Sequence, residues 1–267
     1  MDRKISHSSK LFLGLIFIIL YLPIFFLIFY SFNSGGNMYD FESFSLDSYK
    51  ELFADTRLLI IVLNTLLIAL LSALISTIIG VFGALAIHSF KRRSTKNTLL
   101  SLNNVLIVSP DVIIGASFLI LFTMAGIKLG LYSVLLSHIA FCVPIVVLMV
   151  LPKLFEMSPS LIDAAHDLGA SRFDVLRKVV LPYITPGIFA GFFMALTYSL
   201  DDFAVTFFVT GNGFTTLSVE IYSLARRGIS LNINALSTLL FLFTIILVIV
   251  YYFITVRNKP NGMGVRR

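Results

Sequence analysis

The sequence of 267 residues is 58% hydrophobic and only 13% charged, whereas a soluble domain of this length carries about 25% charged residues. Its single cysteine, Cys142, excludes an intrachain disulfide. The net charge of +6 comes from Lys and Arg residues at the ends of apolar segments, a pattern that follows membrane topology and argues against a nucleic-acid partner. The composition therefore predicts a membrane protein.

The first apolar segment, Leu11–Phe32, follows several basic residues and so resembles the start of a signal peptide. It is too long for the apolar core of a signal peptide, which has about 7–15 residues, and no small-residue cleavage site follows it closely. We therefore expect a retained transmembrane helix with a kink at Pro23. Because residues 33–57 are polar and acidic, residues 1–57 are predicted to form this first helix and an external loop.

Spanning a bilayer takes about 20 apolar residues per helix, and five further segments are candidates for spans. They are Leu58–Phe90, Thr98–Met124 with an interruption at Ser109-Pro110-Asp111, Leu131–Leu151, Gly187–Thr210 and Asn234–Val256. Basic residues gather before the first span, at 91–96, between the fourth and fifth spans, and in the tail at 257–267. Since positive charge marks the cytoplasmic side, we expect six spans with both termini in the cytoplasm. We find no internal sequence repeat that would support an inverted-repeat transporter.

The polar stretch Ser158–Pro182 has the end signals of two short helices. Pro159 fits the first position of a helix, where its missing N–H costs nothing, and the serine before it can cap that helix. Gly169 can end the helix in the left-handed conformation. Ser171 then caps a second helix, and Pro182 is predicted to end it.

The first of these helices is predicted to be amphipathic. Its apolar residues fall on one face: Leu161, Ile162, Ala165 and Leu168. Ala164 leaves a small patch beside that face, which a groove in another protein can enclose. The alternative is a solvated loop helix in which the alanines are ordinary helix formers and the glycine is an ordinary cap.

The spacing of Asp163-Ala164-Ala165, Gly169 and Val179-x-Leu181-Pro182 resembles the signature of binding-protein-dependent ABC importer permeases. In that family the pattern is Glu-Ala-Ala, three residues, Gly, nine residues and Ile-x-Leu-Pro. Asp163 and Val179 depart from it but keep its chemical character. The resemblance covers roughly residues 58–256. It implies an all-α membrane protein with six transmembrane helices, the type I importer (MetI-like) fold, a cytoplasmic coupling helix in the loop at 153–186, and a basic cytoplasmic tail at 257–267.

The resemblance also implies how such a permease works. The coupling segment docks in a cleft on a separate ATPase subunit, and the residues assigned to it are Leu161, Asp163, Ala164, Ala165, Leu168, Gly169, Ser171, Leu181 and Pro182. The assembly would contain a second homologous permease, two ATPase subunits and an extracytoplasmic substrate-binding protein, in the cell membrane. ATP would bind to the ATPase, so this chain would be non-catalytic and without a cofactor. Its glycine-rich stretch Gly211–Thr216 lacks the lysine of a phosphate-binding loop.

A finer resemblance is to the permeases of spermidine/putrescine importers, and among them to the second, C-type membrane subunit. It rests on Ser109–Gly115, Tyr198–Phe203 and Phe208–Gly211, and it implies a cationic small-molecule substrate moved by alternating access. One alternative keeps the same machinery for another solute, such as ferric ion, thiamine or an opine-like compound. Another is an ion-coupled transporter that needs no ATPase, and a membrane scaffold without transport is a third.

Asp201 and Asp202 are expected inside the fifth span. If that helix begins near Gly187, Asp201 lies about 21 Å along it at ~1.5 Å per residue, close to the middle of the membrane. An Asp that faces lipid there costs about 2.5–3.5 kcal/mol, so at least one of the pair should face a water-filled cavity or a partner subunit. Flanked by Tyr198 and Phe203, it could bind a cation.

The alternative for this pair is a packing role between spans, with a hydrogen bond to Thr206 or to a neighbouring subunit. Asp111, after the proline in the interrupted third segment, is a second candidate for cation contact or simply the cap of the half-helix that begins there. The four histidines show no pair at ligand spacing, so no metal site is predicted.

Overall fold

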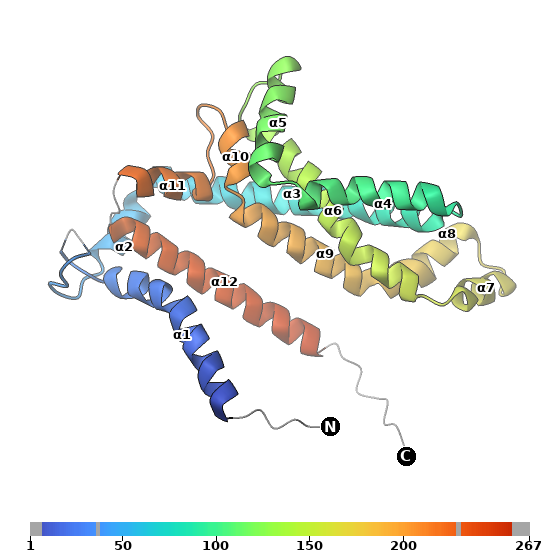
Figure 1. Cartoon of the computed structure of the whole chain (residues 1–267), viewed down its shortest axis with the longest axis horizontal. Helices are drawn as coiled ribbons and strands as arrows, with labels where there is room; N and C mark the ends of the chain where they lie inside the picture. Colours follow the sequence, from blue (N-terminus) through green and yellow to red (C-terminus); the bar gives the residue numbers. More distant parts are fainter. Residues whose placement is uncertain (1–6, 36–37, 228–230, 258–267) are drawn as a thin grey trace. The chain divides into compact units, whose positions relative to one another are not determined.

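The computed structural model describes residues 7–35, 38–227 and 231–257. Within these ranges the chain is helical, apart from loops and one isolated bridge between Asn33 and Phe44. It divides into two compact units, one from residues 1–59 and 223–267 and one from residues 60–222. Figure 1 shows the helices of both.

The first unit holds α1 (His7–Tyr30), α2 (Asp47–Ala54) and α12 (Leu231–Arg257). α12 packs against both of the others, and α1 continues through Pro23 as one helix. In Figure 1 the beginning of α1 and the end of α12 lie at the same end of this unit. This arrangement is what termini on one side of a membrane require. Which side that is stays a prediction.

The second unit is built on α6 (Leu131–Glu156), which packs along α9 (Leu181–Asp201) and against α4 (Arg93–Val108). α5 (Asp111–Met124) packs against α10 (Ala204–Val209). Two helices run from one unit into the other, namely α3 (Thr56–Ser89) and α11 (Leu217–Arg227). The buried core gathers around the inner face of α6, whose fully buried side chains include Val146, Val150 and Leu154.

Glycines allow α3 and α9 to approach α6 closely at Val146. A Cβ atom added to Gly80 of α3 would lie 2.6 Å from the Val146 Cβ, and one added to Gly191 of α9 would lie 3.1 Å from its Cγ1. Side chains larger than hydrogen would therefore push these helices apart. The packing of the unit depends on the absence of a side chain at these two positions.

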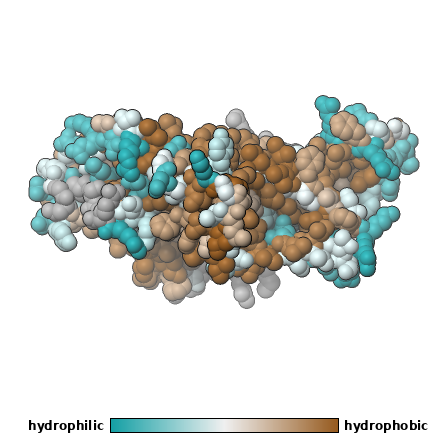
Figure 2. Space-filling model, turned by 90° about the horizontal axis from the view of Figure 1, so that it is seen from above, coloured by the Kyte–Doolittle hydropathy of each residue, from teal (hydrophilic) through white to brown (hydrophobic). Residues whose placement is uncertain are grey.

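Large apolar side chains are also exposed along the long helices. Ile78 of α3 is 59% exposed and Phe189 of α9 is 58% exposed. Figure 2 shows extensive hydrophobic surface, with hydrophilic residues gathered toward both ends of the view, one of which carries α7 (Pro159–Asp167). Soluble monomers rarely expose apolar patches of this extent, whereas lipid can cover them.

Among the described residues, four helices are long and apolar enough to span a membrane, and α4 with α5 adds a fifth if the pair is one bent span. The bend is 102° and falls at Ser109–Pro110, so the predicted interruption of the third segment is confirmed. The predicted sixth span coincides with α12, which has a shorter described apolar stretch, Asn232–Ile246. The total of six spans stays a prediction.

The prediction of a continuous fifth span over Gly187–Thr210 is wrong. α9 ends at Asp201, Asp202 has an extended backbone (φ −64°, ψ 121°), and the short α10 follows. The side chain of Asp202 binds backbone N–H groups in the first turn of α10, so it starts a new helix instead of continuing the old one. Asp201 is therefore the last residue of a helix and not a residue within one.

Pro182 does not end a helix either. α8 (Arg172–Val175) continues through a π-helical turn, η1 (Leu176–Val180), into α9, and Pro182 is the second residue of α9. A proline inside an α-helix removes one N–H donor and crowds the carbonyl one turn earlier. The wider hydrogen-bond spacing of the π turn, in which the Leu181 N–H bonds to the carbonyl of Leu176, relieves this conflict.

Candidate functional site

The polar stretch between α6 and α9 begins at the predicted residue, but the prediction that the Ser158 side chain caps α7 is wrong. α7 starts at Pro159, after Ser158 in an extended conformation (φ −66°, ψ 130°). The Ser158 hydroxyl bonds to the Ser160 hydroxyl at 2.7 Å instead of to a backbone N–H. The start of α7 is thus fixed chiefly by the proline, whose φ is already helical.

Gly169 ends α7 in the left-handed conformation, with φ +81°. Its N–H donates to the carbonyl of His166 at 2.9 Å, and the N–H of Ala170 donates to the carbonyl of Ala165 at 3.0 Å. This pair of bonds is a Schellman motif, which satisfies carbonyls that the helix end leaves free. The predicted cap is confirmed, and it turns the chain away from α7 within two residues.

Ser171 caps α8, also as predicted. Its hydroxyl accepts a hydrogen bond from the Asp174 N–H at 3.2 Å and donates one to the Asp174 carboxylate at 2.5 Å. The same carboxylate pairs with Lys178 at 2.7 Å, one turn further along. These contacts are local, so they fix the start of α8 without help from the rest of the unit.

The prediction of one apolar face on α7 is wrong. Ile162 and Ala165 pack against the buried core of the second unit. Leu161 is 44% exposed, Leu168 is 89% exposed, and Ala164 between them is also exposed. The spacing of i, i+3 and i+7 puts these three on a separate line of the helix, which we call the outer stripe. An apolar line directed away from the core is available for contact with another protein, which is the role that the sequence suggested for the patch at Ala164.

The remaining coupling residues lie at the two ends of the segment. Asp163 is exposed on α7. Leu181 is half-buried against the core at the start of α9, and Pro182 beside it is exposed. Because α8, η1 and α9 form one uninterrupted helical run, the segment that carries α7 is joined directly to α9.

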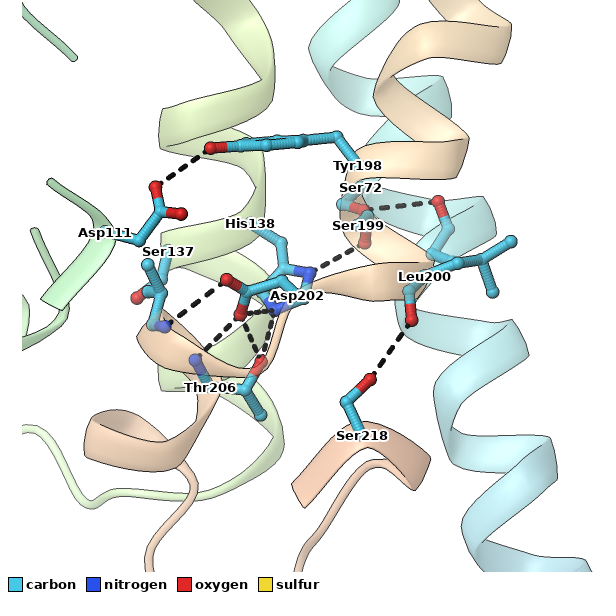
Figure 3. A network of polar contacts seen from close by, with 12 residues as sticks. Ser72, Asp111, Ser137, His138, Tyr198, Ser199, Leu200, Asp202, Thr206 and Ser218 are labelled. Atoms are coloured by element: carbon cyan, nitrogen blue, oxygen red, sulfur yellow. Dashed lines mark hydrogen bonds and ion pairs between the residues drawn. The ribbon is translucent and has the colours of Figure 1, made fainter. Parts of the chain in front are cut away.

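At the other end of α9, Asp202 is held by its neighbours on α10. One carboxylate oxygen accepts from the Val205 N–H at 3.3 Å. The other accepts from the Thr206 N–H at 2.8 Å and from the Thr206 hydroxyl at 2.7 Å (Figure 3). Only 7% of the side chain is exposed. This contact with Thr206 is the packing role that the sequence left open as the alternative.

His138 of α6 is fully buried beside this carboxylate, and sequence reasoning missed it. Its Nδ1 lies 2.7 Å from the Ser199 hydroxyl, and its Nε2 lies 2.8 Å from the Thr206 hydroxyl. The Ser72 hydroxyl of α3 donates to Ser199 at 2.9 Å. The network in Figure 3 therefore joins α3, α6, α9 and α10. A histidine inside an apolar span was the available signal, because a buried polar group needs partners.

Tyr198 and Asp111 meet across the bend between α4 and α5. The Tyr198 hydroxyl donates to a carboxylate oxygen of Asp111 at 2.9 Å. Both residues are exposed. Pro110 holds the N-cap position and Asp111 is the first residue of α5, so the interpretation of Asp111 as a helix cap is wrong. Its carboxylate is directed at α9 instead (Figure 3).

The other two candidates lie at the break itself. Asp201 is exposed at the end of α9. The ring of Phe203 is 4.5 Å from that of Tyr222 and 5.4 Å from that of Phe207, which makes a small aromatic cluster after the break. The structure thus pairs Asp111 with Tyr198, exposes Asp201 and buries Asp202. Among the described residues, no group of three or more His, Cys, Asp or Glu side chains is placed to hold a metal ion.

Comparison with known proteins identifies the family. The inner membrane components of binding-protein-dependent transport systems match residues 76–260. The chain belongs to this family. It is 38% identical over 253 residues to the spermidine/putrescine transport system permease protein PotC of Shigella flexneri, with 95% of each chain covered. It is 35% identical over 230 residues to the putrescine transport system permease protein PotI of Escherichia coli K12, which covers 84% of this chain and 82% of that one.

Solved structures of importers share the fold of this permease. One, from a bacterial ABC transporter that imports the acidic polysaccharide alginate, has a TM-score of 0.74 at 16% identity and covers 95% of this chain and 96% of its own. Another, from the inward-facing methionine transporter MetNI, has a TM-score of 0.64 at 19% identity and covers 74% of this chain and 94% of its own. The predicted family and the MetI-like fold are confirmed, and the coupling signature that suggested them lies inside the matched region.

Proposed function

We propose that this permease is a subunit of an ATP-driven importer that moves polyamines, spermidine or putrescine, through the cytoplasmic membrane by alternating access. The observation that carries the proposal is the 38% identity to a spermidine/putrescine permease over 95% of both chains. Permeases with the same fold serve very different solutes, including the acidic polysaccharide alginate. The choice of a cationic substrate therefore also needs support from the chemistry of the site.

That support comes from the groups exposed at the bend and at the break. Asp111 and Asp201 offer carboxylates to ammonium groups, and Tyr198 offers an aromatic face and a hydroxyl between methylene segments. Phe203 adds a second aromatic ring. Asp202 is already held by the first turn of α10, so we place it behind the substrate pathway, as part of its support.

Tyr198 also gives the site a way to hold and release its ligand. Its hydroxyl satisfies Asp111 in the structure described here. An ammonium group that reaches Asp111 replaces a neutral donor by a charged one, and charged hydrogen bonds are about twice as strong. When the ammonium group leaves, the hydroxyl returns. The carboxylate therefore has a partner in both states, which keeps binding reversible.

Energy would enter through α7. The outer stripe, Leu161, Ala164 and Leu168, would dock in an ATPase subunit, and the Schellman motif at Gly169 would hold α7 at a fixed angle to α8. Movement of α7 would pass along α8 and η1 into α9, whose far end carries Tyr198 and Asp201. On this proposal the chain is non-catalytic, its termini and α7 are cytoplasmic, and its partners are a second permease, two ATPase subunits and an extracytoplasmic binding protein.

The deciding experiment is uptake of labelled spermidine into vesicles that contain the complete assembly, with ATP inside or outside. The proposal expects uptake that depends on ATP and on the binding protein and that excess putrescine inhibits. ATP-dependent uptake of thiamine or ferric ion, without uptake of spermidine, would keep the importer and change its cargo. Transport by the purified permease alone, driven by an ion gradient, would overturn the importer itself.

A further inference from the structure

The buried hydrogen-bond network around His138 crosses an otherwise apolar interior. Ser72, His138 and Thr206 are fully buried, and Ser199 is 3% exposed. None of them can exchange its partner for water without opening the unit, so each unpaired group would carry the full cost of desolvation. The amino-acid sequence alone gives these four residues no role in transport, although they lie directly behind the exposed pair Tyr198 and Asp201.

The donors and acceptors of this hydrogen-bond network follow one direction. The Thr206 hydroxyl gives its single proton to Asp202, so its oxygen must accept from Nε2–H of His138. For a neutral imidazole this assigns the proton to Nε2 and leaves Nδ1 as an acceptor. Nδ1 then accepts from the Ser199 hydroxyl, whose oxygen accepts from Ser72. Donation therefore runs from Ser72 through Ser199, His138 and Thr206 to Asp202.

The hydrogen-bond network also sets the rotation of the last turn of α9 about its helix axis. Ser199 and Asp202 are three residues apart and lie on one side of the helix end, whereas Tyr198 and Asp201 lie on the neighbouring side. His138 bonds to Ser199 directly and to Asp202 through Thr206. Holding the buried side in place directs the exposed side toward the pathway.

The same contacts fix α5 relative to α9. α5 packs against α10, and a Cβ atom added to Gly115 of α5 would lie 2.8 Å from the Phe208 side chain and 3.0 Å from the Val205 Cα. Thr206 lies in the same short helix and is bonded to His138. The position of Asp111, which reaches Tyr198 from the start of α5, therefore depends on the same network.

We propose that His138 is a positioning residue of the transport site. Its neutral imidazole fixes the break between α9 and α10 so that Tyr198, Asp201 and Asp111 face one ligand. The nature of that ligand rests on the proposed function, but the positioning itself does not. A misplacement of about 1 Å in such a site can cost up to about 100-fold in activity. A residue that touches no substrate can therefore still control how well transport is coupled to ATP hydrolysis.

The variants are chosen to separate positioning from packing. His138→Ala removes both hydrogen bonds of the imidazole, the one to Ser199 and the one to Thr206. His138→Gln keeps a donor near the position of Nε2, and thus the hydrogen bond to Thr206 and through it to Asp202. Ser137→Ala is the matched control, because the Ser137 hydroxyl is equally buried but, among the described residues, donates to the Ser133 carbonyl within α6 and to no other helix.

The first measurement is the number of spermidine molecules imported per ATP hydrolysed by the complete assembly. This ratio does not depend on how much protein is folded. We expect His138→Ala to lower it about tenfold, His138→Gln to restore most of it, and Ser137→Ala to leave it unchanged. An unchanged ratio in His138→Ala, or an equal loss in His138→Ala and His138→Gln, would overturn the proposal.

The second measurement needs no substrate. In a Cys142→Ala background, which removes the only cysteine of the chain, a cysteine introduced by Asp201→Cys is labelled with a water-soluble maleimide. We expect His138→Ala to change the labelling rate about fivefold or more, and His138→Gln and Ser137→Ala to leave it unchanged. If spermidine is not transported at all, the proposed function fails while this rate still decides the role of His138; equal rates in all variants would disprove it.

Discussion

Tyr198 and Asp111 are 87 residues apart in the sequence, yet the tyrosine hydroxyl donates a 2.9 Å hydrogen bond to the aspartate carboxylate. The contact joins the end of α9 to the start of α5. It therefore lies at the bend in the third predicted segment and one turn before the break in the fifth. Two interruptions that separate apolar segments in the sequence therefore meet at one exposed carboxylate. This is the reason to look for the substrate at the broken helices.

Asp111→Asn should lower spermidine uptake at least about tenfold, because a hydrogen bond to a charged group contributes about 1.5–3 kcal/mol. Tyr198→Phe should lower it only about twofold to threefold, since the ring remains and only a neutral donor is lost. Initial uptake rates of the complete assembly test both. Asp47→Asn is the control for loss of one negative charge, as Asp47 is exposed on α2 and pairs with Lys50. Normal uptake by Asp111→Asn would remove this residue from the site.

Gly169→Val should weaken association with the ATPase subunit. In the described part of the chain, no atom lies within 4 Å of an added Cβ, so the cost comes from the backbone. A side chain at φ +81° costs about 1–2 kcal/mol, and more for a β-branched one. Gly169→Asn is the matched control, because asparagine accepts the left-handed conformation. Co-purification of the ATPase in detergent measures the effect. Equal recovery with valine and asparagine would show that the turn after α7 does not govern docking.

The helix ends of the coupling segment were predictable because their causes are local. Pro159, Gly169 and Ser171 each act on backbone groups within five residues. The end of α9 was missed although part of its cause is local, because the side chain of Asp202 binds the N–H groups of Val205 and Thr206. The residues after Asp202 continue an apolar run, which favours a continuous span, and the contact of Thr206 with His138, 68 residues away, cannot be read from that run.

Two predictions from the sequence were wrong because tertiary packing overrides the general rule for that residue pattern. A proline usually marks the end of a helix, but a π turn before Pro182 lets the helix continue. The apolar residues of α7 divide between the core and the outer stripe because α7 packs on the unit through Ile162 and Ala165. Neither the π turn nor the surface that receives α7 can be read from the spacing of apolar residues.

The division of α7 predicts which position contacts the ATPase. A cysteine introduced by Ala164→Cys lies on the outer stripe and should form crosslinks to the ATPase efficiently. One introduced by Ala165→Cys lies against the core, so its crosslinking rate should be lower by a factor of about ten or more. Both are made in the Cys142→Ala background, and the same bifunctional reagent is used for each. Faster crosslinking at position 165 would mean that α7 turns its other face to the partner.

Close packing at Val146 gives a test that is independent of transport. Gly80→Ala should lower the thermal stability of the purified permease, because the new Cβ would lie 2.6 Å from the Val146 Cβ and 3.2 Å from the Val143 carbonyl oxygen, and overpacking costs about 1–3 kcal/mol. Gly83→Ala, one turn further along α3, is the matched control, since its Cβ would make an ordinary 3.4 Å contact with Val147. Adding Val146→Ala to Gly80→Ala should restore part of the loss, because it removes the methyl groups that the new Cβ meets. Equal melting temperatures for Gly80→Ala and Gly83→Ala would show that α3 can move away from α6 without cost.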